Sequence, residues 1–317
     1  MARILESLSI AVLAVALLPG LPVAAQEASP PPLDSIDVGR HVRTYALYTP
    51  AMTPPSPAVL LVLHGNPGDG ALIRGLTGKA VERLADRHGF LVVYPDGFER
   101  GWNGCREGAP YAANVQGIDD VAFLRALVDR LEAERGVDPS RVWTFGFSNG
   151  GHMAIRLALE APDEFPAVAV VAASLPTADA LDCNPSGRPA SVLIVNGTAD
   201  PINPFDGGEV RTESAGRIGV VRSSRESALY FAELIEAPNE PETKILLSDS
   251  RGEPVVERAR WHGEEGREVV LVTVHGGDHS IPGSSTPSSE EAGAVELDAA
   301  LAAVEFFRRV TGGSGSR

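Results

Sequence analysis

The chain has 317 residues, a formal net charge of −15 at pH 7 and two cysteines. So acidic a surface repels polyanions, and we therefore expect no nucleic-acid partner. Single α/β domains commonly reach this length, and no repeat or long low-complexity stretch divides the sequence. One domain without a separate binding module is expected.

Residues 1–25 have the pattern of a removable signal peptide. Arg3 precedes an apolar stretch at 8–18, and the small residues Val23-Ala24-Ala25 provide a cleavage site. The apolar stretch is shorter than the roughly 20 residues that span a bilayer. We predict export to the periplasm or the medium, with no stable membrane association after cleavage; a retained anchor is the alternative.

Removing these 25 residues from 317 leaves 292. The Pro-rich segment 26–35 is predicted to be a flexible spacer, and the Gly/Ser-rich end at 312–317 a flexible tail. Residues 36–311 remain as the catalytic domain.

Apolar runs bounded by turn residues alternate with amphipathic stretches along this domain. The segment 41–50 alternates like an edge strand. Buried strands are expected at 58–64, 90–95, 142–147, 167–173, 191–197 and 268–274. Helices fit between most of these strands, and a long one is expected at 289–310. This order predicts a mainly parallel sheet covered by helices on both faces.

The stretch 117–136 is the clearest helix between two strands. Its apolar residues fall on one face, Asp119 or Asp120 can cap its start, and Gly136 stands where it should end. We interpret both aspartates as structural.

The region 205–267 interrupts the alternation of strand and helix. It contains one amphipathic helix at 223–237 and two short strands near 244–248 and 254–261. Such an excursion at the sheet edge either shapes a pocket or only packs.

Gly146, Ser148 and Gly150 form a G-x-S-x-G pattern with a strand before it and a helix after it. In a nucleophile elbow the serine takes a strained backbone conformation, and the two glycines let strand and helix approach each other. We predict that Ser148 is a nucleophile; an ordinary tight turn is the alternative.

A nucleophilic serine needs a base and an acid, which follow it along the chain in this type of fold. Asp200 stands just after the strand at 191–197, and His279 lies in the Gly-flanked loop after the last strand. We predict these two as acid and base. His275 abuts the strand and is the weaker candidate base, and Asp206 and Asp278 are the fallback acids. The other histidines occupy the wrong places in the order: His41, His64, His88, His152 and His262.

Acyl transfer also requires donors for the developing oxyanion. The backbone amide after the nucleophile belongs to Asn149. The second donor is expected in the loop "HGNPGDG", where Pro67 has no amide hydrogen, so Asn66 is predicted and Gly65 is next. A plain Gly-rich turn is the alternative interpretation of this loop.

Together these segments resemble the exported polyhydroxybutyrate depolymerase and feruloyl esterase family of α/β-hydrolases, the LpqC-like carbohydrate esterase type. The resemblance covers about 36–311 and rests most specifically on "GFSNGGHMA" and "NGTADPINP". It implies an α/β-hydrolase fold with an insertion before the last strand. It also implies a serine esterase without metal or cofactor, acting on short-acyl, phenolic or hydroxyalkanoate esters.

The chain departs from that family at several positions. Asn196 stands where a histidine is common, and Ile281 where a tryptophan is common, which puts the aromatic or polyester substrate in more doubt than the reaction. Trp102 is a candidate wall for a phenolic or sugar ring, or else a packed residue. Cys105 and Cys183 can form one disulfide or remain two buried thiols.

The predicted function is thus that of an exported serine esterase with Ser148, His279 and Asp200 as its triad. A polyester depolymerase, a peptidase of the same fold and a non-catalytic binding protein are the alternatives. The partner is an ester that is a small molecule or an oligomer.

Overall fold

The computed structural model describes residues 31–284, apart from 78 and 214, and residues 297–312. The predicted signal peptide, positions 26–30 of the spacer and the tail beyond 312 lie outside the described residues. No helix within the described ranges has the length and apolar character needed to cross a membrane.

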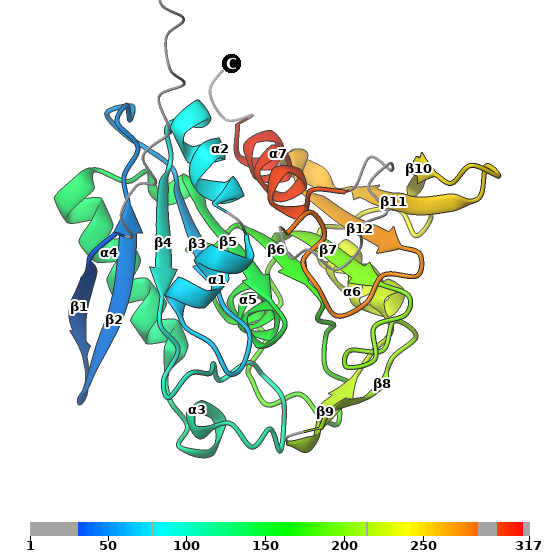
Figure 1. Cartoon of the computed structure of the whole chain (residues 1–317), viewed down its shortest axis with the longest axis horizontal. Helices are drawn as coiled ribbons and strands as arrows, with labels where there is room; N and C mark the ends of the chain where they lie inside the picture. Colours follow the sequence, from blue (N-terminus) through cyan, green and yellow to red (C-terminus); the bar gives the residue numbers. More distant parts are fainter. Residues whose placement is uncertain (1–30, 78, 214, 285–296, 313–317) are drawn as a thin grey trace, which may run out of the picture. The chain divides into compact units, whose positions relative to one another are not determined.

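A ten-stranded sheet runs through the domain in the order β1-β2-β4-β3-β5-β6-β7-β12-β11-β10 (Figure 1). Its strands are β1 Leu33–Val38, β2 His41–Tyr48, β3 Val59–Leu63, β4 Leu91–Pro95, β5 Val142–Phe147, β6 Ala167–Val171, β7 Ser191–Gly197, β10 Glu242–Ser248, β11 Pro254–His262 and β12 Glu268–Val274. The six strands from β4 to β12 pair in parallel, and an antiparallel pair extends the sheet on each side. The predicted mainly parallel sheet is confirmed.

The predicted edge strand at 41–50 is β2, but it does not lie at the edge. β1 pairs with it in antiparallel register from Leu33 opposite Ala46 to Val38 opposite His41. β1 therefore begins inside the segment 26–35 that was predicted to be a flexible spacer. The prolines of that segment favour a loose chain, yet pairing with β2 and packing of Ile36 and Val38 on the core hold Leu33–Val38 as a strand.

Helices cover both faces of the sheet. They are α1 Gly70–Leu76, α2 Ala80–His88, α3 Ala112–Val115, α4 Asp120–Arg135, α5 Asn149–Glu160, α6 Ser224–Leu234 and α7 Ala299–Thr311, with short 3-10 turns at Pro139–Arg141 and Glu264–Gly266. One buried cluster joins α1, α2 and α7 to one face, and two others join α4, α5 and α6 to the opposite face.

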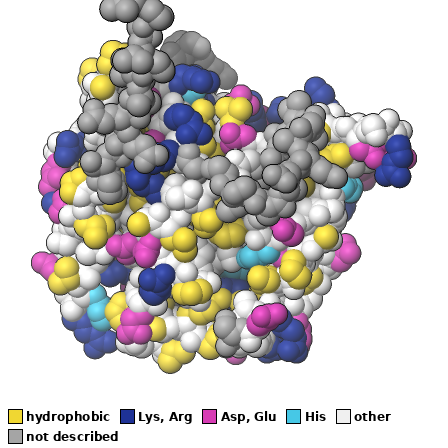
Figure 2. Space-filling view, viewed as in Figure 1, with side chains coloured by type: hydrophobic (Ala, Val, Ile, Leu, Met, Phe, Trp, Pro, Cys, Tyr) yellow, Lys and Arg dark blue, Asp and Glu magenta, His cyan; other side chains and the backbone are white. Residues whose placement is uncertain are grey.

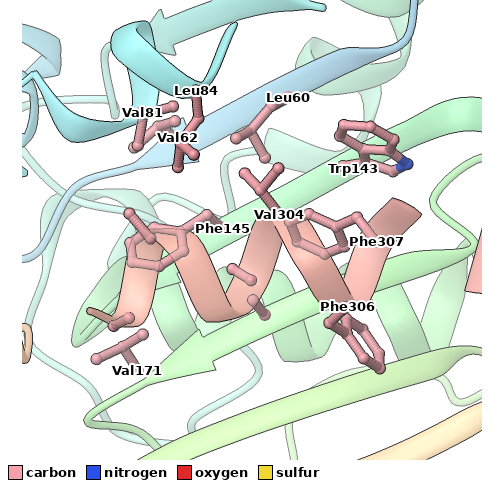
Figure 3. Packing of buried hydrophobic residues seen from close by; sticks show 14 of the residues in the cluster. Leu60, Val62, Val81, Leu84, Trp143, Phe145, Val171, Val304, Phe306 and Phe307 are labelled. Carbon is pink, nitrogen blue, oxygen red and sulfur yellow. The ribbon is translucent and has the colours of Figure 1, made fainter. Parts of the chain in front are cut away.

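The packing of α7 shows why its sequence closes the domain. Val304 and Phe307 are one turn apart and face the sheet, where Phe307 stacks on Trp143 with ring centroids 5.5 Å apart (Figure 3). Asp298 caps the helix by accepting a hydrogen bond from the Leu301 amide at 2.9 Å. The helix was expected from residue 289, but within the described residues it begins at Ala299, because this cap fixes its first turn.

The sequence between β7 and β12 forms an insertion with two parts. In the first, β8 Gly208–Thr212 and β9 Gly216–Val221 make a separate antiparallel hairpin, which the sequence did not reveal. In the second, α6 is followed by β10 and β11, the two expected strands, which extend the main sheet beyond β12 (Figure 1). The hairpin lies near the loops that follow β5 and β12.

Candidate active site

Ser148 stands in the turn between β5 and α5 with φ 54° and ψ −115°. Residues with a side chain rarely adopt such a positive φ. A side chain on Gly146 would collide with the carbonyl of Gly150, and one on Gly150 would collide with the carbonyl of Leu63. Strand and helix therefore approach too closely for any residue but glycine at both positions. This close approach explains the G-x-S-x-G spacing, and it holds Ser148 at the tip of the turn.

The three residues predicted as a triad lie within hydrogen-bond distance of one another. His279 Nε2 is 2.9 Å from Ser148 Oγ, and His279 Nδ1 is 2.8 Å from Asp200 Oδ2. They meet because β5, β7 and β12 are parallel, so the loops after these strands share one edge of the sheet.

The surroundings of Asp200 fix its orientation. The amides of Ile202 and Asn203 donate to Asp200 Oδ1 at 2.8 and 2.9 Å, which leaves Oδ2 toward His279. Because a carboxylate only accepts, the His279 hydrogen resides on Nδ1, and Nε2 is left to accept a proton from Ser148. The arrangement can therefore raise the nucleophilicity of the serine hydroxyl.

The alternative acids and base lie elsewhere. Asp278 accepts a hydrogen bond from its neighbour Ser280, and His275 lies 3.6 Å from Glu257 at the surface. Asp206 stands in the turn before the hairpin and lines a different hollow from Ser148. None of the three takes part in the contacts of His279 that the structure describes.

The two predicted oxyanion donors flank Ser148. Asn149 opens α5, so its amide is at a helix N-terminus, where the backbone carries partial positive charge. The loop with Asn66 also approaches Ser148, because a methyl group built on Gly65 would lie 3.3 Å from Ser148 Cβ and Asn66 lines the same cavity. Both amides are placed on the loops from which an oxyanion hole is made.

Comparison with known proteins identifies the family. Residues 38–215 match the family model "Esterase", described as "Putative esterase". The chain belongs to this esterase family. It is also 34% identical over 261 residues to "Putative esterase NocK" of Nocardia uniformis subsp. tsuyamanensis, covering 79% of this chain and 74% of that protein.

One further relative is an esterase, and one solved structure shares the fold. A feruloyl esterase C of Emericella nidulans is 34% identical over 118 residues, but the chain spans only 38% of its length. Among solved structures, an acetyl xylan esterase from Aspergillus awamori superposes with a TM-score of 0.55 at 17% identity, covering 79% of this chain and 94% of that one. The fold is an α/β-hydrolase fold, and the protein is a carboxylic ester hydrolase.

A cavity of about 210 Å³ opens beside Ser148 and His279 in this esterase. The hairpin supplies part of its wall through Val210, Thr212 and Ile218. The insertion thus shapes the pocket with its hairpin, whereas no residue of β10 or β11 lines it.

Trp102 does not line this cavity, so its predicted role as a wall for a substrate ring is wrong. Its side chain is fully buried, its indole Nε1 donates to the carbonyl of His64 at 3.0 Å, and the Arg43 guanidinium lies over its ring. It packs beneath the loop of the oxyanion donors. The aromatic residues at the cavity are instead Tyr111 and Phe147.

The two positions that depart from the family are filled without reaching the cavity. Asn196 is buried and donates to Ala173 O and Ser224 Oγ at 3.1 and 2.8 Å. Ile281 packs in the main core. Neither residue lines the cavity beside Ser148, so an effect of Ile281 on substrate choice would be indirect.

Two basic residues of the cavity, His152 and Arg106, were not predicted as site residues from the sequence. His152 lies one helical turn after Ser148 on α5, and this i, i+4 spacing could have placed it at the site. Burial lowers its pKa well below the usual 6.5, and the nearby charge of Arg106 lowers it further. Arg106 is the second residue, 2% exposed, and nothing in its local sequence indicates a site.

Cys105 and Cys183 form a disulfide across 78 residues of sequence. Of the two alternatives that the sequence left open, the bonded one is realised. Around it, the Asp182 amide donates to Cys105 O at 2.8 Å, and Arg106 pairs with Leu181 in a short β-bridge. The disulfide therefore fixes the backbone of the segment that carries Arg106.

Proposed function

We propose that this protein is an exported serine esterase that uses Ser148, His279 and Asp200 as a catalytic triad. The observation that carries the proposal is the chain of contacts from Ser148 Oγ through the His279 ring to Asp200 Oδ2. The sequence order of serine, acid and histidine agrees with this assignment.

The reaction follows from the roles of these groups. His279 Nε2 takes the proton of Ser148 as Oγ attacks the ester carbonyl, and the amides of Asn149 and Asn66 donate to the oxyanion. The imidazolium then protonates the departing alcohol, which leaves an acyl group on Ser148. Water attacks this acyl-enzyme, His279 takes a proton from that water and returns it to Ser148 Oγ, and the carboxylic acid is released.

Short-acyl, compact phenolic and hydroxyalkanoate esters are the proposed substrates. The cavity of about 210 Å³ is below the usual 300–1,000 Å³ of sites for drug-sized ligands, which favours a small group beside Ser148. Charged side chains of both signs are interspersed with small apolar patches on the face seen in Figure 2. Among the described side chains of this face, the apolar ones do not gather into the broad surface with which a protein would bind a lipid interface.

Substitution of the nucleophile tests the proposal. Ser148→Ala should lower kcat on 4-nitrophenyl acetate by at least about a thousandfold, because no nucleophile then remains. Ser186→Ala, on an exposed loop, is the matched control and should retain wild-type activity. A Ser148→Ala variant that keeps more than about a tenth of the wild-type rate would contradict the assignment.

Covalent labelling tests directly whether Ser148 is an activated nucleophile. A fluorophosphonate probe should label wild-type protein at Ser148 and leave Ser148→Ala unlabelled. Matched ester and amide substrates then distinguish an esterase from a peptidase, which would use the same groups. Faster cleavage of the amide would overturn the ester specificity.

Export is the second part of the proposal. It rests on the pattern of residues 1–25, and a disulfide is typical of proteins from oxidising compartments. N-terminal sequencing of the protein recovered from the periplasm or the medium should begin near Gln26. A chain retained in the cytoplasm with Met1 or Ala2 at its start would contradict export.

A further inference from the structure

The cavity beside Ser148 contains one permanently charged side chain. Among the described residues that line it, Arg106 is the sole lysine, arginine, aspartate or glutamate. His152 adds no charge near neutral pH, because burial depresses its pKa. The electrostatic character of the cavity wall away from the triad is therefore set by Arg106.

Arg106 is buried without an acidic partner. No carboxylate of the described residues lies within ion-pair distance of its guanidinium, and its Nε has no hydrogen-bond partner. Among the described residues Tyr111 is its partner, through a hydrogen bond to the Tyr111 side chain and a ring centroid 5.5 Å from the guanidinium carbon, and neither contact supplies a carboxylate. Arg43, the other buried arginine in the described part of the chain, is paired with Asp120 at 2.8 Å.

The side chain is held in place from several directions. The β-bridge with Leu181 and the adjoining disulfide fix its backbone. Its aliphatic part lies against Gly219 of β9, where an added methyl group would come within 3.1 Å of Arg106 Cδ. Gly219 also has φ 139°, so the hairpin leaves room for this side chain at a position that disfavours other residues.

We propose that Arg106 is the counter-ion for a carboxylate on the substrate, so that this esterase acts on esters whose acyl or alcohol part carries an acid group. Burial of a charge without a partner is unfavourable, and a bound carboxylate would supply the missing partner. The planar guanidinium suits a carboxylate because it can donate two parallel hydrogen bonds. The proposal rests on the proposed function of Ser148 and names the class of ester that the site selects.

Matched pairs of esters test it on wild-type enzyme. One pair places the charge on the acyl side: mono-4-nitrophenyl adipate and its methyl ester. The other places it on the alcohol side: 3-acetoxybenzoate and methyl 3-acetoxybenzoate. After subtraction of spontaneous hydrolysis, kcat/KM should favour the free acid by about tenfold or more in at least one pair.

Variants assign this preference to the guanidinium. Arg106→Gln should abolish the preference mainly through a higher KM for the acid, and Arg106→Lys should keep part of it because the charge remains. Arg222→Gln is the matched control, since Arg222 also lies over a tyrosine ring, that of Tyr230 at 5.1 Å, but outside this cavity. It should keep the full preference.

The outcomes separate this proposal from the proposed function. Equal wild-type kcat/KM within both pairs, with turnover abolished by Ser148→Ala, would overturn the carboxylate proposal alone. Turnover that survives Ser148→Ala would overturn the triad and the carboxylate proposal with it. The wild-type comparison decides even if Arg106→Gln does not fold.

Discussion

The site is built from two regions that differ in how tightly the sequence determines them. The catalytic edge comprises the loops after β5, β7 and β12, with Ser148, Asp200 and His279. The outer wall comprises the segment 106–111, which follows the disulfide-bonded Cys105, and the hairpin β8–β9. At the catalytic edge, backbone segments approach each other so closely that certain positions must be glycine. In the outer wall, side chains from segments distant in the sequence pack together.

This difference separates the chemistry of the esterase from its selectivity. The edge holds the groups that we propose to break the ester bond, and this chemistry does not depend on the substituents of the ester. The wall holds Arg106, Tyr111 and the apolar residues of the hairpin, which line the cavity beside Ser148 and would face the parts of a substrate away from the reacting carbonyl. Changes at the edge should therefore affect all esters alike, whereas changes in the wall should alter the order of preference.

The largest effect is expected at the edge, from Asp200→Asn. The amide would favour the wrong tautomer of His279, and kcat should fall by about ten-thousandfold for every ester, while the fold is retained. Measurement of kcat for one charged and one neutral ester checks both parts. A drop confined to one of them would place Asp200 in substrate binding instead.

The predictability of the site follows the same division. Ser148, Asp200 and His279 could be found from sequence because each follows a strand whose apolar run is plain, and because Gly146 and Gly150 mark a steric requirement. The strands that precede them belong to one parallel set at the centre of the sheet, so their loops had to meet.

The wall could not be predicted for physical reasons. The hairpin residues Val210 and Ile218 become core residues only by packing on one another and on Tyr111, about a hundred residues earlier in the chain. Trp102 remained a candidate for the pocket because sequence cannot show that Arg43 lies over its ring. Arg106 carries no local pattern at all, since its partners Gly219 and Leu181 are distant in sequence.

Removal of the disulfide should make the outer wall more flexible and leave the catalytic edge unchanged. Cys105→Ser with Cys183→Ser should lower the free energy of unfolding by about 3 kcal/mol, because a long loop is no longer closed in the unfolded chain. Fluorophosphonate labelling of Ser148 at 25 °C should persist, while the preference for carboxylate esters weakens. Loss of labelling in a folded sample would show that edge and wall are not separable.

The dependence of activity on acyl chain length tests the outer wall, and the expected effect is of intermediate size. Because the cavity is small, kcat/KM for 4-nitrophenyl esters should be highest for short acyl groups and at least about tenfold lower at twelve carbons. The hairpin also carries charged residues such as Arg211 and Glu209, which disfavour a lipid surface. A steady rise to twelve carbons, or rapid clearing of solid polyhydroxybutyrate, would contradict this substrate range.

The pH dependence of the free energy of unfolding tests the burial of His152, a residue on α5 that lines the cavity. Its folded-state pKa is depressed by burial, so below pH 6.5 the unfolded chain binds the proton more readily than the folded chain. The free energy of unfolding should therefore be fully retained above pH 6.5 and fall as the pH drops. His64, with a pKa also lowered by burial, adds to this loss.

Thermal unfolding between pH 7.5 and 5 checks the contribution of His152. His152→Gln should reduce the loss of Tm on acidification, because the glutamine does not titrate. His275→Gln, at a partly exposed position, should leave the loss as in wild type. An unchanged slope in His152→Gln would show that other groups govern the acid sensitivity.

The smallest effect on activity is expected from substitution of Asn66, because its proposed role belongs to the backbone amide and not to the side chain. Its amide is the proposed oxyanion donor, whereas its side chain only donates to the carbonyl of Arg100 at 3.0 Å at the protein surface. Asn66→Ala keeps the amide and should lower kcat by less than about tenfold.

Asn149→Ala is the matched comparison. This variant also keeps its backbone amide, but the Asn149 side chain is buried and is hydrogen-bonded to both the N–H and the carbonyl of Trp102, at 2.7 and 3.0 Å. Its removal leaves two buried backbone groups without partners, so Asn149→Ala should lower both Tm and kcat more than Asn66→Ala does. A loss at Asn66→Ala as large as that of Ser148→Ala would mean that the Asn66 side chain itself contacts the reacting ester.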